Sequence, residues 1–73
     1  MNNIDIRKYI IDNFKEDSPD KIRDSIDTTI KFKDEDALIG LGVLFELLWN
    51  NLSNEEKEQS ITKIHNSIKN NIN

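Results

Sequence analysis

The chain has 73 residues, no cysteine and a net charge of −4 at neutral pH. That length leaves room for one small domain, and the missing cysteines exclude disulfide bonds and thiolate chemistry. No apolar run approaches the roughly 18 residues that cross a membrane, and no basic segment followed by an apolar one indicates a secretion signal. We therefore expect an intracellular protein with no membrane partner.

The first two segments have the apolar spacing of amphipathic helices. The first helix is expected to run from residue 4 or 5 to Phe14. The second should begin at Ser18 and Pro19, because serine is a good N-cap and proline is tolerated in the first turn. It should end near Lys31, whose positive charge suits the C-terminus of a helix.

The third segment, residues 37–51, is also expected to be helical, but its start can be placed in two ways. Asp34 or Asp36 could cap a helix that contains both Gly40 and Gly42. Alternatively, a short turn precedes a helix that starts near Gly40, because glycine is a poor helix former.

A capping box in residues 53–56 predicts the start of a fourth helix, which carries Ile61, Ile64 and Ile68 on one face and frays over residues 70–73. The expected fold is therefore all-α. We expect residues 1–73 to form a single small bundle of about four short helices, ordered over about residues 4–69, with the apolar third helix at its centre.

Residues 38–49 contain one charged side chain, Glu46, among twelve residues. A helix that is apolar nearly all round is buried by its neighbours or by a partner. If the other three helices enclose it, Glu46 must face solvent or find a partner such as a lysine. Alternatively, one face stays open as a docking or dimer surface. The residues expected in the core, or on that surface, are Leu41, Leu44, Phe45, Leu48 and Trp49.

No arrangement of residues indicates catalysis, a cofactor or a metal ion. The acidic clusters lie in expected connectors and first helical turns, where capping and solubility account for them. Gly40 and Gly42 lack the preceding strand and the lysine of a phosphate-binding loop, and we expect them to let a neighbouring helix or turn approach closely. His65 has no second ligand at helical spacing. We therefore assign no catalytic, cofactor-binding or metal residues.

Direct DNA binding is not expected either. The net charge is −3 over residues 1–36 and −1 over residues 37–73, whereas phosphate binding depends on clustered lysine and arginine. A helix-turn-helix built from the second and third helices would offer no arginine, asparagine or glutamine to base edges before Asn50.

The run GLGVLFELLW at residues 40–49 resembles the signature of the small acid-soluble spore protein I family, short proteins of endospore-forming Firmicutes. Weaker similarity covers about residues 4–69, including Ile6 and Arg7, which resemble an apolar–arginine pair of the family. The family tends to place a proline where this chain has Ile39. The motif residues are Gly40, Leu41, Gly42, Val43, Leu44, Phe45, Glu46 and Trp49.

This resemblance implies a minor spore protein, made in the forespore during sporulation and located in the spore core, without catalytic residues. Two functional hypotheses follow. The protein is a non-enzymatic structural protein of the spore core, or it is an interaction module whose apolar helix binds a second copy or an unidentified spore protein.

Overall fold

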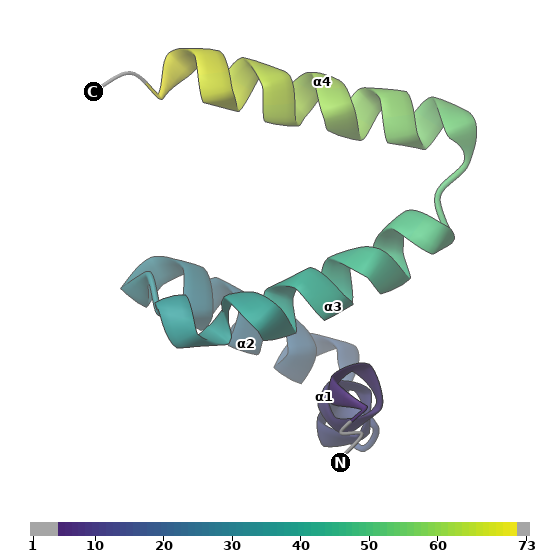
Figure 1. The fold of residues 1–73 in the computed structure, drawn as a ribbon, viewed down its shortest axis with the longest axis vertical. Coiled ribbons are helices and arrows are strands. Elements are labelled where there is room, and N and C mark those ends of the chain that lie inside the picture. The colour runs from purple at the N-terminus through teal and green to yellow at the C-terminus, as the bar shows by residue number, and fades with distance from the viewer. Residues whose placement is uncertain (1–4, 72–73) are drawn as a thin grey trace.

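The computed structural model describes residues 5–71 and shows four α-helices and one short 3₁₀ helix (Figure 1). No strand occurs within this span, so the expected all-α fold is confirmed. The elements are α1 (Ile6–Phe14), α2 (Pro19–Phe32), η1 (Glu35–Ala37), α3 (Leu38–Asn50) and α4 (Asn54–Asn70). Fraying was expected for residues 70–73, but α4 continues through Asn70, and residues 72 and 73 lie outside the described residues.

The starts of α2 and α4 follow the capping signals in the sequence. Ser18 Oγ accepts a hydrogen bond from the backbone N–H of Lys21, and proline occupies the first turn of α2. At α4, Ser53 Oγ accepts from the backbone N–H of Glu56, and Glu56 Oε1 accepts from the N–H of Ser53. Both predicted starts are confirmed, because capping depends only on residues three positions apart.

The start of α3 combines the two alternatives that the sequence left open. A short η1 turn comes first, and its cap is Asp34, whose carboxylate accepts from the N–H of Asp36 at 3.0 Å. The α-helix then begins at Leu38 and contains both glycines. Lys33 ends α2 in the left-handed conformation, with a φ of 53°, and its N–H bonds back to the last turn of α2.

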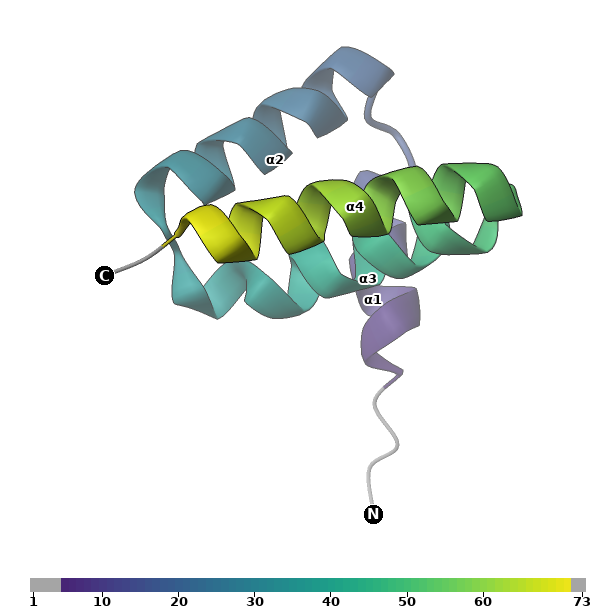
Figure 2. The ribbon, with the colours of Figure 1, turned by 90° about the horizontal axis from the view of Figure 1, so that it is seen from above.

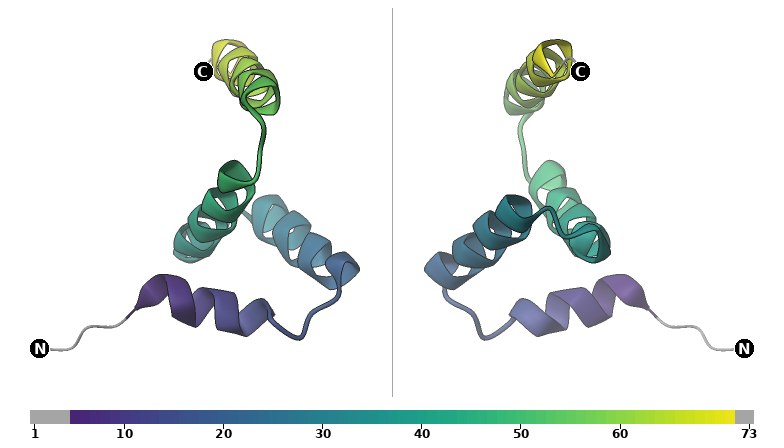
Figure 3. Two further views of the ribbon diagram at one scale, coloured as in Figure 1. Left: turned by 90° about the vertical axis from the view of Figure 1, so that its right-hand side faces the viewer. Right: turned by 90° about the vertical axis from the view of Figure 1, so that its left-hand side faces the viewer.

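The first three helices form an open triangle, and α4 stands apart from it (Figure 3). In two perpendicular views α4 runs alongside α3 in the opposite direction, joined to it by a short connector (Figures 1 and 2). The radius of gyration is 14.4 Å, against about 11 Å for a compact domain of this length. The arrangement is therefore open rather than closely packed.

The enclosure of α3 by the other helices, which the sequence led us to expect, is wrong. Among the described residues only Val43 is buried, at 7% exposure. Phe45 and Leu48 are 44% and 54% exposed. The helix packs mainly against α1 and η1. Because α3 is apolar nearly all round and its neighbours are short helices with narrow apolar stripes, they cover one side of α3 and leave the rest accessible.

Candidate interaction surface

The one charged residue of the apolar run is held by α1. Arg7 donates from Nε to Glu46 Oε1 at 2.7 Å and from Nη2 to Glu46 Oε2 at 2.9 Å. This bidentate pair joins α1 to α3 across 39 residues of sequence. The sequence predicted solvent or a basic partner for Glu46, and the partner is an arginine. Because both side chains are largely exposed, the pair fixes how α1 sits on α3 more than it adds to stability.

This pair makes stability depend on pH. The hydrogen bonds and positive charge of Arg7 lower the pKa of the Glu46 carboxyl. A carboxyl with a lowered pKa in the folded state stabilises the fold fully above its unfolded pKa, about 4.3 for glutamate. That contribution is lost as the pH falls through the lowered value. We expect the melting temperature to drop on acidification and Glu46→Gln to make this drop shallower, as measured by circular dichroism from about pH 2 to 7.

A second group contributes in the same pH range, so the Glu46 variant should not abolish the effect. Hydrogen bonds from Lys8 and Lys15 lower the pKa of Asp12, and their loss also destabilises the fold in acid. Glu55→Gln is the control, because Glu55 forms no ion pair within residues 5–71. If the melting temperature of Glu46→Gln falls on acidification as steeply as that of the original chain, the pair between Arg7 and Glu46 does not form in solution.

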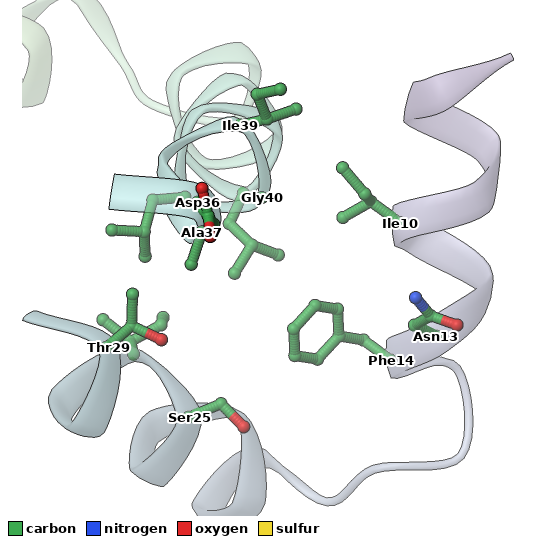
Figure 4. A pocket seen from close by; sticks show the side chains of 12 residues that line it. Ile10, Asn13, Phe14, Ser25, Thr29, Asp36, Ala37, Ile39 and Gly40 are labelled. Atoms are coloured by element: carbon green, nitrogen blue, oxygen red, sulfur yellow. The ribbon is translucent and has the colours of Figure 1, made fainter. Parts of the chain in front are cut away.

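A cavity of about 270 Å³ lies inside the triangle of α1, α2 and α3 (Figure 4). Phe14 and Ile10 of α1 point into it, opposite the start of α3. Its lining is mostly apolar, and Asp36 is its one charged residue. Leu41 and Leu44, two of the five residues singled out from the sequence, also line it. The cavity is the loosely filled centre of the triangle, where these leucines supply packing surface.

The outer face of α3 consists of Leu38, Gly42, Phe45 and Trp49, which share one side of the helix at spacings of three and four residues. Phe45 and Trp49 stack with ring centroids 5.5 Å apart. A Cβ at Gly42 would have no atom within 4 Å, and the same holds for Gly40. The expectation that these glycines admit a close neighbour is therefore wrong within residues 5–71, because nothing described there approaches them.

The isoleucine face of α4 is turned toward this outer face. Lys57 Nζ lies 5.4 Å from the centroid of the Trp49 ring, which ties the first turns of α4 to the end of α3. Ile61, Ile64 and Ile68 continue the side of the helix on which Lys57 lies, and all three are exposed. Two apolar faces of one chain thus lie near each other, and neither covers the other.

The five residues singled out from the sequence do not form one cluster. Phe45 and Trp49 lie on the outer face, the two leucines at 41 and 44 line the cavity, and Leu48 is exposed. The sequence did not indicate that α4 would lie near this surface. The spacing of the three isoleucines of α4 predicted an apolar face on that helix. The neighbouring sequence did not indicate which surface would lie opposite this face.

Comparison with known proteins decides the family. The family model described as small, acid-soluble spore protein I matches residues 4–68. The chain belongs to this family. It is 32% identical over 66 residues to the small, acid-soluble spore protein I of Geobacillus sp. (strain WCH70), covering 90% of this chain and 93% of that protein. It is 29% identical over 68 residues to the protein of the same name from Bacillus cytotoxicus, covering 93% and 97%.

Family membership places the chain among the spore proteins of sporulation, and the resemblance seen in residues 40–49 is confirmed. No solved structure shows significant similarity to it. Within residues 5–71, none of the helices has the length and apolar character needed to cross a membrane.

Proposed function

We propose that this member of the small acid-soluble spore protein I family is a non-enzymatic structural protein of the spore core, made in the forespore during sporulation. The observation that carries the proposal is the family match over residues 4–68. The character of the accessible surface is consistent with it. What the described residues offer is apolar and aromatic contact area on α3 and α4, which suits packing against other molecules.

DNA is not assigned as a partner in this proposal. The net charge of −4 would repel a phosphate backbone, and both halves of the chain are acidic. We infer that the protein accumulates beside the DNA of the core rather than coating it. A mobility shift that is tight at low salt and weakens steeply with added salt would contradict this part of the proposal.

Mass spectrometry of acid extracts tests where and when the protein occurs. We expect the 8.5 kDa species in dormant spores and not in vegetative cells. It should remain in spores whose coats have been stripped chemically, because core proteins lie inside the layers that stripping removes. Detection in vegetative cells, or loss with the coat fraction, would overturn the location. Disappearance on germination would indicate that the protein also serves as an amino-acid reserve.

A further inference from the structure

We propose that two copies of this chain pair through the outer face of α3 and the isoleucine face of α4. In this dimer the two α4 helices run antiparallel about a two-fold axis that passes near Ile64. The inference rests on surface area, on Gly42 and on charge, and it holds whether or not the protein resides in the spore core.

The accessible surface of the chain exceeds that of a compact monomer by about the area that a second copy would cover. The accessible surface is 6727 Å², against about 4,700 Å² for a compact monomer of this mass. Even if the six residues outside 5–71 exposed as much as an unfolded chain, about 1,000 Å², an excess of more than about 1,000 Å² would remain. Obligate homodimers bury about 1,000–2,500 Å² per chain. The excess accessible area of the chain therefore matches the area that each chain of a stable dimer buries.

Gly42 gives the outer face a place for a close neighbour. A glycine inside a helix destabilises the helix relative to alanine. Within the described chain no contact offsets that cost, since the space beside Gly42 is empty to 4 Å. Without a Cβ, the backbone of α3 can be approached closely by a helix from another molecule. Gly42 lies between Leu38 and Phe45 on this face, so the approach would cover both exposed side chains.

The charges of α4 are self-complementary when two copies run antiparallel. Its first turns carry Glu55, Glu56 and Glu58 with one lysine, Lys57, and its later turns carry Lys63 and Lys69. None of these six forms an ion pair within residues 5–71. An antiparallel partner places an acidic start against a basic end, twice. Closure of α4 onto α3 of the same chain would not do this, because α3 has no lysine or arginine.

The register follows from the helical repeat. With Ile64 at the axis, Ile61 lies opposite Ile68 of the partner subunit, so the apolar stripes coincide. Glu58 and Lys69 occupy the same flank of the stripe. A two-fold axis keeps each flank on its own side, so Glu58 meets the partner subunit's Lys69.

Sedimentation equilibrium of the full chain tests the association. We expect twice the 8.5 kDa mass of one chain. Ile64→Glu places two like charges at the axis and should raise the dissociation constant by about 100-fold or more. Asn66→Glu is the matched control, because it adds the same charge on the opposite side of the same helix and should leave association unchanged. A chain that stays monomeric up to about 1 mM would overturn the proposal, whether or not α4 closes on its own α3.

Charge reversal tests the orientation without touching the apolar stripe. Glu58→Lys and Lys69→Glu should each weaken association by about tenfold, and the double variant should restore it to within about threefold of the original. Both positions are exposed in the monomer, so the fold is retained, and circular dichroism checks this. Single variants that bind normally, or a double variant that stays weak, would show that the helices do not meet in this antiparallel register.

Discussion

Val43→Asp is expected to unfold the part of the chain formed by α1, α2 and α3. Val43 is the one buried side chain within residues 5–71, and it lies on the helix that packs against α1. A carboxylate at this position would be buried without a partner, which costs more than about 3 kcal/mol. So small a domain has little stability to lose. Far-ultraviolet circular dichroism at 25 °C should show most of the helical signal lost.

Leu48→Asp is the matched control for this variant. Leu48 lies on the same helix, is 54% exposed and does not line the cavity, so the same carboxylate would remain in water there. We expect the control to keep its helical signal and to melt close to the original temperature. A Val43→Asp variant that melts like the control would mean that Val43 is not buried in solution.

Trp49→Ala is expected to release α4 and to leave the other three helices folded. Trp49 is half-buried, stacks on Phe45 and lies beneath Lys57 of α4. An isolated helix of 17 residues such as α4 is marginal in water. Hydrogen exchange of the chain diluted to about 1 μM, to disfavour association, should show loss of protection in α4 amides only.

Phe32→Ala controls for the loss of an aromatic ring. Phe32 is exposed and also has a lysine over its ring, with Lys31 Nζ 5.9 Å from the centroid, but this contact lies within one helix. The Phe32→Ala variant should leave hydrogen-exchange protection unchanged in all four helices. If Trp49 were at the centre of an enclosed core, its truncation would instead cost about 3–5 kcal/mol and unfold the whole chain. Loss of protection throughout the described chain would therefore support an enclosed bundle with Trp49 at its centre, which the structure contradicts.

The sequence indicated one of the two faces of the proposed dimer more clearly than the other. The outer face of α3 was indicated by a run of twelve residues with one charge, and Phe45 and Trp49 were among the residues expected in the core or on an open surface. The isoleucine face of α4 was visible only as the stripe of one more amphipathic helix. A single stripe identifies the side of a helix that must be covered, but it does not identify the molecule that covers it.

The sequence by itself determined the four helices, the starts of α2 and α4, and the family. Each depends on short-range information: Ser18 and Ser53 cap their helices through residues three positions away, and residues 40–49 carry the family signature. It did not determine the partner of Glu46, because Arg7 is 39 residues distant and several basic side chains had the right charge.

Only the tertiary structure decided how much of α3 is covered. An apolar helix gains from burial on any side, so its composition is equally compatible with enclosure by its own chain and with pairing to another. The outcome depends on the total area that three short amphipathic helices can supply. Here that area covers Val43 but not Phe45 or Leu48, and α4 remains apart from α3.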